Sequence, residues 1–506
     1  MTKRPVTLAE LMRDAPLRGT LPAELASRLV SGLAYDSRRV EPGFLFFAFP
    51  GAKTDGRQFA GDAVSRGALA VVSESPQPEG FPGHWVETKH GRQTLALASK
   101  EFFGRLDEKI HVIGVTGTNG KTTIVFEIDS ILRAAKRVTA MIGTIEYRVG
   151  PGTLRAVNTT PESLDIHTIL AELDAAGGTH LAMEASSHAL ALGRTYGIHF
   201  QVGVFTNLTR DHLDFHPTME DYFAAKRLLL EGAGAPPPPF LVLNYDDEWA
   251  RRIEVPEGSE VLWYGLSAGA GVRARKISST IEGLRFEVEH GGGAFPVESR
   301  MVGRINVSNI LAACAVGLAE GLTPEEIASG VAALPAVPGR FERIDEGQDF
   351  AVVVDYAHTE DALRNTIAIA RDLTRGRVIT LFGCGGDRDR KKRPGMGMAA
   401  AEGSEFVVLT SDNPRSEDPL AIMNDALVGL RRFDTAHVVE PDRATAILRA
   451  ISEARKGDIV ILAGKGHETY QELRTGRIDF DDREVARKVL RAQGYERAPD
   501  AMESPQ

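Results

Sequence analysis

A glycine-rich segment between a short apolar run and a helical pattern carries the residue types that bind phosphate. The run at 111–115 leads into TGTNGKTT at 116–123, and apolar residues then recur with a helical period. Glycines let backbone N–H groups turn toward one point, a helix N-terminus adds positive charge, and a lysine reaches terminal phosphates. Val115 stands where the standard G-x-x-x-x-G-K-[ST] loop has its first glycine. We therefore predict a shortened nucleotide loop, rather than an ordinary glycine turn, that binds through Gly117, Thr118, Asn119, Gly120, Lys121, Thr122 and Thr123.

Carboxylates and imidazoles follow two later apolar runs. Glu184 ends the run HLAME, and the segment TNLTRDHLDFH adds Asp211, His212, Asp214 and His216. Together with the Thr122 hydroxyl, such groups can bind Mg²⁺ on a triphosphate, because Mg²⁺ prefers oxygen ligands and keeps several waters. Spacing alone does not select among them. Each histidine can equally be a hydrogen-bonded residue at a strand end.

A third group of polar residues follows the run FVVLT near the C-terminus. In Ser411-Asp412-Asn413-Pro414-Arg415 an acid, an amide and a guanidinium stand together at an expected strand end. An arginine fork pairs with a carboxylate through two parallel hydrogen bonds, which suits recognition of an acidic ligand. The alternative is a surface turn with a solvated arginine.

The elements that must position these groups alternate along the chain. Short β-branched runs are separated by helical patterns: HVIGVTG, HLAMEAS, VGVFTNL, FLVLNYDD, AVVVDYAH, VITLFGCGG, FVVLTSDNP and DIVILAGKG. Runs that are apolar on both faces are typical of parallel strands covered by helices, and ligands bind at the carboxyl ends of such strands. The sequence therefore predicts an α/β fold with its polar groups gathered at strand ends.

Changes in composition predict three domains, in keeping with a chain of 506 residues. The first, 1–105, is turn-rich and is expected to be a small N-terminal α/β domain. The second, 106–337, is expected to be a central ATPase domain with a P-loop-type parallel sheet. The third, 338–495, is expected to be a Rossmann-like C-terminal α/β domain, and 496–506 a tail. The Pro- and Gly-rich stretch LPAVPGRFE marks the second boundary.

The overall composition is that of a globular protein. Lys plus Arg number 59 and Asp plus Glu 69, which gives a net charge of −10 and no basic block for nucleic acid. The 43% hydrophobic and 25% charged residues exclude bulk disorder. Two cysteines cannot build a disulfide framework, and neither an export signal nor an apolar run of about 20 residues is visible. We expect a cytoplasmic monomer that binds no nucleic acid and inserts into no membrane.

Beyond these patterns, the chain resembles the Mur ligases along almost its whole length. The segments TGTNGKTT, MEASSHAL, TNLTRDHLDFH, YFAAKRLL, GRINVSNILAA, PGRFERI and VDYAHTEDAL occur in the order that this family uses. YDSRRVEPGFLFFAFPG, GCGGDRDRKKRP, SDNPRSEDP and AGKGHE resemble the members that add diaminopimelate. The resemblance implies an ATP-dependent amide ligase of peptidoglycan precursor synthesis. Its three domains are expected to bind the UDP-sugar, ATP and the amino acid, in that order.

The resemblance also implies the reaction and its catalytic groups. It is expected to join meso-2,6-diaminopimelate to the D-Glu side-chain carboxylate of UDP-N-acetylmuramoyl-L-Ala-D-Glu through an acyl phosphate made with ATP. Lys121 would act on the phosphates, and Mg²⁺ would be held by Thr122, Glu184, His212 and Lys226, the last as a carbamate. By itself Lys226 is predicted to be a solvated helix lysine.

By the same resemblance, each substrate has its own set of residues. The UDP-muramoyl dipeptide would contact Tyr35, Ser37, Asn158, Thr159, Thr160, Ser186 and Arg194, with the turn Ala52, Lys53, Thr54 as a weaker candidate. ATP would also contact Asn306, Arg340 and Asp355. Diaminopimelate would contact Arg388, Asp412, Asn413, Pro414, Arg415, Gly464 and Glu468. The chain departs from the family pattern at Leu192, Ile305 and Glu360.

Three alternatives remain at this point. Relatives that add L-lysine or another diamino acid generally lack the arginine of the Asp-Asn-Pro-Arg motif, so Arg415 favours diaminopimelate. A folylpolyglutamate synthetase-like enzyme would share the central fold but is disfavoured by the DSR segment and the same motif. A nucleotide-dependent switch or binding module would use the phosphate loop without needing either organic substrate.

Overall fold

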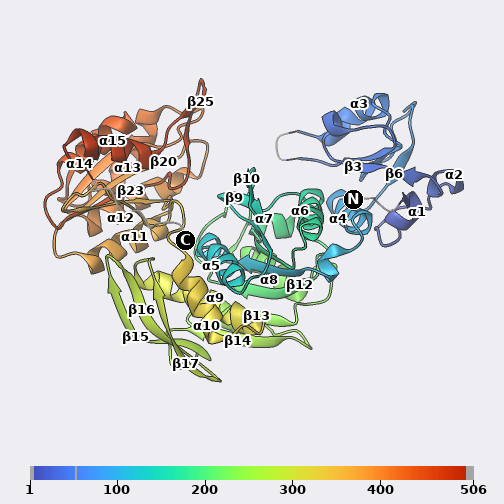
Figure 1. The fold of residues 1–506 in the computed structure, drawn as a ribbon. Helices are drawn as coiled ribbons and strands as arrows, with labels where there is room; N and C mark the ends of the chain where they lie inside the picture. Colours follow the sequence, from blue (N-terminus) through green and yellow to red (C-terminus); the bar gives the residue numbers. More distant parts are fainter. Residues whose placement is uncertain (1–4, 52–53, 497–506) are drawn as a thin grey trace. The chain divides into compact units, whose positions relative to one another are not determined.

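The computed structural model describes residues 5–51 and 54–496, so Ala52, Lys53 and the tail beyond 496 lie outside the described residues (Figure 1). Two compact units divide the chain: unit 1 contains 1–273 and 311–330, and unit 2 contains 274–310 and 331–506. Each unit is therefore discontinuous in sequence. The three predicted domain boundaries stay a prediction.

The N-terminal part of unit 1 is a small α/β layer, as predicted. Its four parallel strands lie in chain order: β3 (Gly32–Ala34), β4 (Phe44–Ala48), β5 (Ala70–Ser73) and β6 (Trp85–Glu87). The helices beside them are α3 (Ala60–Ser65) and α4 (Gly91–Phe102). Two further short helices, α1 (Leu8–Leu11) and α2 (Ala23–Ala26), stand with the antiparallel pair β1 (Val6–Thr7) and β2 (Leu29–Val30).

The rest of unit 1 is built on a parallel sheet, which confirms the central expectation. Its strands run in the order β8 (Thr139–Ile142), β11 (His180–Glu184), β7 (His111–Thr116), β12 (Phe200–Phe205), β13 (Phe240–Asn244) and β14 (Glu260–Gly265). Val115 pairs in register with Glu184 on one side and Val204 on the other. The carboxyl ends of β7, β11 and β12 therefore meet at one edge of the sheet.

One apolar cluster packs α6 (Ser163–Ala175), α7 (Ser187–Ala191) and α8 (Met219–Glu231) against this sheet. The same part of unit 1 also contains α5 (Lys121–Ala134), the second half of α9 (Arg304–Ala319) and most of α10 (Pro324–Ala333). Ser130 Oγ in α5 donates to the Gly330 carbonyl at 2.7 Å, which ties the later segment to the earlier one. Among the described residues, none of the helices combines the length and apolar composition needed to cross a bilayer.

Unit 2 contains the second predicted sheet, which is parallel except for its edge strand β18. Its strands run in the order β18 (Glu342–Ile344), β19 (Ala351–Asp355), β23 (Ile459–Ala463), β20 (Val378–Cys384), β21 (Phe406–Ser411) and β22 (Ala436–Glu440). One apolar cluster packs α11 (Glu360–Leu373), α12 (Arg393–Gly403) and α13 (Pro419–Leu430) on one face. Another packs α14 (Arg443–Ser452) and α15 (Asp482–Ala492) on the other.

Antiparallel strands are the main feature that the sequence patterns did not predict. They include β9 (Glu146–Val149), β10 (Gly152–Arg155), β16 (Gly283–His290), β17 (Gly293–Ser299), β24 (Tyr470–Leu473) and β25 (Gly476–Asp479). The strand β15 (Val272–Thr280) pairs in parallel with β14; it begins in unit 1 and continues in unit 2. Along β17, buried and exposed residues alternate. Such half-buried strands lack the continuous apolar run that identifies a parallel strand.

Candidate active site

The predicted phosphate loop joins the carboxyl end of β7 to α5 in a conformation that requires glycine. Gly117 has φ +145° and Gly120 has φ +89°, in the region that L side chains rarely adopt. A Cβ on Gly117 would stand 1.8 Å from Thr206 Oγ1, so a side chain has no room there. The loop lies directly against the end of β12.

Two residues after β12 fix the shape of this loop. The Asn207 carbonyl accepts from Thr118 N at 2.9 Å, and its side-chain oxygen accepts from Asn119 N at 2.9 Å. Thr206 Oγ1 donates to the Asn119 carbonyl at 2.7 Å. The sequence patterns did not identify Thr206 or Asn207, although both lie in the segment TNLTRDHLDFH. The loop is thus held in shape by the protein itself.

Lys121 and Lys226 converge on one carbonyl oxygen. Lys121 Nζ donates to Gly117 O at 2.9 Å, and Lys226 Nζ, from α8, donates to the same oxygen at 2.7 Å. Lys226 is only 1% exposed, so the prediction of a solvated helix lysine from pattern alone was wrong. Burial, and then the charge of Lys121, hold the pKa of Lys226 well below its usual value. Burial therefore favours deprotonation of this amine at the phosphate loop.

Glu184 stands at the centre of a set of oxygen atoms beside this loop. Its Oε1 accepts from Thr122 Oγ1 at 2.9 Å and from Thr144 N at 2.7 Å, and its Oε2 accepts from Thr144 Oγ1 at 3.2 Å. Neighbouring ligands of an octahedral Mg²⁺ with bonds near 2.05 Å lie about 2.9 Å apart. The Thr122 and Glu184 oxygens therefore fit two positions around one Mg²⁺.

His212 lies in a group of rings close to this loop. It has φ +54°, and its ring lies 4.8 Å from that of His188 and 6.0 Å from that of Tyr222, centroid to centroid. Lys226 Nζ lies 4.5 Å from the centre of the same Tyr222 ring. Desolvation lowers the pKa of His212 to about 4, against the opposing charge of Asp211, which favours the neutral imidazole, although 43% of the side chain is exposed to water. A neutral ring can bind a metal ion, but the assignment of His212 as a ligand stays a prediction.

Several residues predicted for the dipeptide gather around the end of β11. Thr160 Oγ1 donates to the Glu184 carbonyl at 2.8 Å and accepts from Ser186 N at 3.0 Å. Arg194 donates to the Thr160 carbonyl at 2.9 Å and to Glu162 at 3.1 Å. The structure thus places Thr160, Ser186 and Arg194 in one network beside the oxygen set of Glu184.

The other residues predicted for the dipeptide lie nearby or in the N-terminal layer. Thr159 Oγ1 lies 3.1 Å from Thr144 Oγ1, and Asn158 N donates to the Tyr147 hydroxyl at 3.1 Å. Tyr35 donates to Asp165 Oδ2 at 2.6 Å, and Ser37 is buried at the start of the short helix η1 (Ser37–Arg39). Asp165 was not anticipated, because nothing in α6 distinguishes it from an ordinary surface acid.

Three nucleotide candidates belong to unit 2. Asp355 ends β19, where its carboxylate accepts from Phe341 N at 2.7 Å and from Ala357 N at 2.8 Å. Burial raises its pKa, although the charge of Arg340 opposes this. Arg340 and Asp355 are therefore neighbours, whereas Asn306, in α9, donates to the Val302 carbonyl at 2.8 Å.

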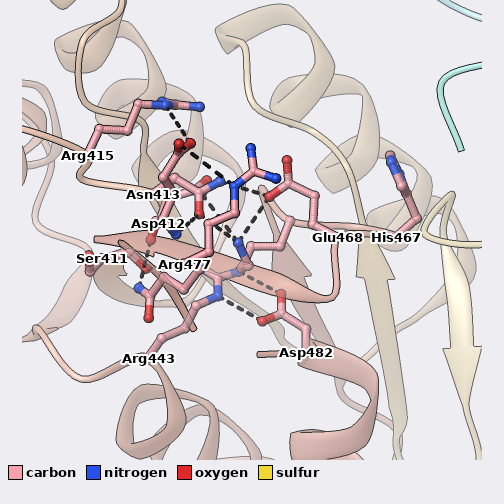
Figure 2. A network of polar contacts seen from close by, with 12 residues as sticks. Ser411, Asp412, Asn413, Arg415, Arg443, His467, Glu468, Arg477 and Asp482 are labelled. Carbon is pink, nitrogen blue, oxygen red and sulfur yellow. Dashed lines mark hydrogen bonds and ion pairs between the residues drawn. The ribbon is translucent and has the colours of Figure 1, made fainter. Parts of the chain in front are cut away.

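The residues that follow β21 belong to a network of polar contacts in unit 2 (Figure 2). Asn413 Nδ2 donates to Glu468 Oε2 at 2.8 Å, and Lys465 Nζ donates to the same carboxylate at 3.0 Å. Lys465 Nζ also donates to Asn413 Oδ1 at 3.1 Å. Gly464 has φ +113°, and a Cβ there would lie 2.8 Å from Asp412 Oδ2. These contacts join the segments that follow β21 and β23.

Arg415 is held over this network by both neighbouring segments. Its NH1 donates to the Gly386 carbonyl at 2.7 Å and its Nε to Glu472 Oε2 at 3.1 Å. Pro414 precedes it, and a Cβ on Gly386 would come within 2.0 Å of the Pro414 carbonyl. Arg388 is exposed, and its NH1 donates to the Asp387 carbonyl at 3.4 Å. A Cβ on Gly385 would lie 3.2 Å from Arg415 NH1 and 3.8 Å from Arg388 Cγ, so Arg388 also lies beside Arg415. The assignment of these residues to diaminopimelate stays a prediction.

A buried ion pair supports the network from below. Arg443 donates to Asp482 at 2.8 and 2.6 Å, and also to the carbonyls of Ser411 and Ala463 at 3.2 and 3.0 Å. These two carbonyls end β21 and β23. Neither Arg443 nor Asp482 belongs to a motif that the sequence patterns identified. Lys465, in contrast, could have been identified within AGKGHE.

The chain matches known families over most of its length. Residues 29–102 match the family described as "Mur ligase family, catalytic domain". Residues 115–317 match "Mur ligase middle domain", and 339–466 match "Mur ligase, glutamate ligase domain".

Individual relatives are similar along almost the entire chain. The UDP-N-acetylmuramoyl-L-alanyl-D-glutamate--2,6-diaminopimelate ligase of Solibacter usitatus (strain Ellin6076) is 64% identical over 490 residues, 97% of this chain and 99% of that relative. The ligase of the same name from Geobacillus kaustophilus (strain HTA426) is 44% identical over 469 residues, 92% of this chain and 96% of its own.

Solved structures agree with this relationship. A structure of a UDP-N-acetylmuramoyl-L-alanyl-D-glutamate--2,6-diaminopimelate ligase has a TM-score of 0.70 at 33% identity, covering 97% of this chain and 100% of that one. The MurF ligase of Thermotoga maritima in complex with ADP shares the fold, with a TM-score of 0.62 at 21% identity over 91% of this chain and 98% of its own.

Proposed function

This chain belongs to the Mur ligase family, and we propose that it joins meso-2,6-diaminopimelate to UDP-N-acetylmuramoyl-L-Ala-D-Glu in peptidoglycan precursor synthesis in the cytoplasm. ATP is the second substrate and is converted to ADP and phosphate. The amide forms between an amino group of diaminopimelate and the D-Glu side-chain carboxylate.

The phosphate loop positions ATP for the first step. Backbone N–H groups at 120–122, at the N-terminus of α5, attract the phosphates, and Lys121 moves from the Gly117 carbonyl to the terminal phosphate. The D-Glu carboxylate then attacks the γ-phosphorus, ADP leaves, and an acyl phosphate remains. Asn306, Arg340 and Asp355 bind the rest of the nucleotide in this proposal.

Thr122 and Glu184 would hold Mg²⁺, because their oxygens are the ligand type that this ion prefers. Lys226 and His212 would complete the site. When bound, the ion would supply positive charge to neutralise the transferred phosphoryl group. The neutral amine of Lys226 adds to CO₂ and loses a proton, which gives a carbamate anion, and its lowered pKa favours that reaction.

The network of Thr160, Ser186 and Arg194 orients the dipeptide so that its carboxylate faces the phosphate. Asn158 and Thr159 extend this surface, and Tyr35 and Ser37 would contact the UDP-sugar. The diaminopimelate amine then attacks the acyl carbon, phosphate leaves, and the nitrogen gives up one proton.

The observation that carries the choice of amino acid is the position of Arg415. Its guanidinium is fixed at a strand end by Gly386 and Glu472, above the Asn413–Glu468 pair. Diaminopimelate differs from lysine by a distal carboxylate, which such a guanidinium can bind through two hydrogen bonds. Lysine lacks this carboxylate and would not form these hydrogen bonds, so the pocket favours diaminopimelate.

The test is a phosphate-release assay with the full chain, ATP and Mg²⁺. We expect release only when UDP-N-acetylmuramoyl-L-Ala-D-Glu and meso-diaminopimelate are both present, with product confirmed by mass spectrometry. Equal turnover with L-lysine would identify a lysine-adding ligase instead. Phosphate release that ignores both organic substrates would identify a nucleotide-dependent switch.

A further inference from the structure

Two histidines begin adjacent strands at the edge of the central sheet that lies farthest from the phosphate loop. His111 is the first residue of β7 and His180 the first of β11, and they pair in register. Their ring centroids lie 5.0 Å apart. The phosphate loop follows the other end of β7, roughly 17 Å away at about 3.3 Å per residue. Neither histidine has a part in the proposed reaction.

Glu320 brings a carboxylate between these two rings. It directly follows the last residue of α9, and its side chain is only 3% exposed. Its Oε2 lies 2.7 Å from His111 Nδ1 and 3.4 Å from His180 Nε2. Its Oε1 is buried and has no hydrogen-bond partner among the described residues. A buried carboxylate with an unused oxygen retains capacity for a further ligand.

The three donor atoms have the spacing and support of a metal site. They all lie within 4.8 Å of one another. Neighbouring ligands of a tetrahedral Zn²⁺ with bonds near 2.05 Å stand about 3.3 Å apart. The 3.4 Å between His180 and Glu320 already fits, and His111, 46% exposed on its side chain, can rotate to adjust. Thr179 Oγ1 lies 2.7 Å from His180 Nδ1, the outer contact that orients a ligating imidazole.

We propose that His111, His180 and Glu320 form a second cation site, for a divalent transition metal such as Zn²⁺, separate from the nucleotide-bound Mg²⁺. Two imidazoles and one carboxylate suit such a metal better than Mg²⁺, which prefers oxygen ligands. Three protein ligands leave a fourth position for water on the exposed side of His111. The bound cation ties the end of α9 to the first residues of β7 and β11, so it stabilises unit 1.

The test is titration of the metal-stripped, nucleotide-free full chain with ZnCl₂, followed by calorimetry and by thermal melting. We expect one equivalent of Zn²⁺ to bind and to raise the Tm. His111→Ala and Glu320→Gln are expected to weaken this binding at least tenfold and to abolish the Tm shift. Co²⁺ in place of Zn²⁺ is expected to give visible d–d absorption in the wild type and not in either variant.

Two control variants distinguish Zn²⁺ binding at this site from metal binding at other histidines or at the proposed Mg²⁺ site. His437→Ala removes an exposed imidazole on β22 and is expected to leave Zn²⁺ binding unchanged. Glu184→Gln disrupts the proposed Mg²⁺ site and is expected to retain the Zn²⁺-dependent Tm shift. Absence of Zn²⁺ binding by the wild type, unchanged binding by His111→Ala, or loss of the shift in Glu184→Gln would each overturn the proposal. Ligase turnover of His111→Ala, expected to equal that of the wild type, verifies that this variant folds.

Discussion

Arg415 and Glu472 are joined twice: the Arg415 Nε donates to the Glu472 carboxylate at 3.1 Å, and the Arg415 backbone N donates to the Glu472 carbonyl at 3.0 Å. The guanidinium therefore already faces a carboxylate, the group that the distal end of diaminopimelate presents. Glu472 in turn donates its backbone N to Asn413 Oδ1 at 2.9 Å. Glu472 therefore belongs to the same hydrogen-bond network as the residues of the proposed amino-acid pocket.

Arg415→Ala is expected to raise the KM for diaminopimelate by roughly 30-fold or more. This corresponds to about 2 kcal/mol, the scale of a hydrogen bond to a charged group. The KM for ATP is expected to stay unchanged. Arg474→Ala is the matched control, because this exposed arginine lies between β24 (Tyr470–Leu473) and β25 (Gly476–Asp479) in the same region. Steady-state kinetics measure both, and an unchanged KM in Arg415→Ala would remove Arg415 from the pocket.

Glu472→Gln is expected to lower the KM for diaminopimelate up to about fivefold. Glu472 competes with the substrate carboxylate for Arg415, and partly exposed ion pairs of this kind contribute up to about 1 kcal/mol. The glutamine keeps the backbone contact to Asn413. A higher KM in this variant would show instead that Glu472 binds the substrate, for example its ammonium group.

Lys226→Ala is expected to abolish most turnover, with partial recovery when formate or acetate is added. The small anion would take the place of the carbamate beside Gly117. Chloride at the same ionic strength is the control, since it cannot supply a carboxylate. Failure of both carboxylates to restore any turnover would argue against the carbamate and leave the ligase assignment untouched.

Lys226→Met is expected to stabilise the protein while it inactivates the enzyme. Since burial lowers the folded-state pKa of Lys226, the unfolded chain binds more protons than the folded protein between that pKa and about 10.4. Stability therefore falls as the pH falls through this range. In bicarbonate-free buffer at pH 7 we expect a Tm increase of roughly 2–4 °C, which shrinks toward pH 10. The Gly117 carbonyl keeps Lys121 as a donor.

Lys100→Met is expected to lower the Tm, in contrast to Lys226→Met. Lys100 is also buried, but its Nζ is paired with Asp107 at 2.8 Å. Breaking a buried pair leaves an uncompensated charge and costs about 3–5 kcal/mol. We therefore expect thermal melting to show Tm changes of opposite sign for the two variants. A lower Tm for Lys226→Met would show that Lys226 is charged and stabilising in the folded protein.

Glu127→Gln is expected to flatten the pH dependence of stability. Glu127 is fully buried in α5, and neither side-chain oxygen has a hydrogen-bond partner among the described residues. Burial raises its pKa well above the usual value, so the folded state retains a proton that the unfolded chain loses above about pH 4.3. Stability therefore falls as the pH rises from there toward the folded-state pKa.

Urea unfolding at pH 5 and pH 8 measures this effect. We expect the wild type to lose more stability than Glu127→Gln between these two values. Glu172→Gln, an exposed position on α6, serves as the control and is expected to follow the wild type. A pH dependence that Glu127→Gln leaves unaltered would place the ionisation elsewhere.

The parallel strands and the polar groups at their ends could be predicted because burial on both faces leaves a continuous apolar run. Glu184 and Asp412 follow such runs, and the register of the sheets brings them into their networks. Gly117 and Gly464 were also predicted as site residues. At both positions an added Cβ would meet a side-chain oxygen of another segment, so glycine is needed there.

Other features depend on contacts that no local pattern encodes. Lys226 lies on a helix that reads as amphipathic, and only packing against the phosphate loop shows that the lysine is buried. Arg443 and Asp482 are 39 residues apart and meet only in the folded sheet. The antiparallel strands β16 and β17 have alternating burial, which is a weak signal beside the long apolar runs of the parallel sheets.

The order in which the chain is made has a consequence for how it folds. Unit 1 needs 311–330, yet 274–310, which precede them, belong to unit 2. A nascent chain that has emerged only as far as 273 lacks Glu320 beside His111 and the Gly330 carbonyl beside Ser130. The hydrophobic core of the nucleotide domain therefore closes late in translation. Fragments that stop before 330 are expected to emerge incompletely packed and to need chaperone protection.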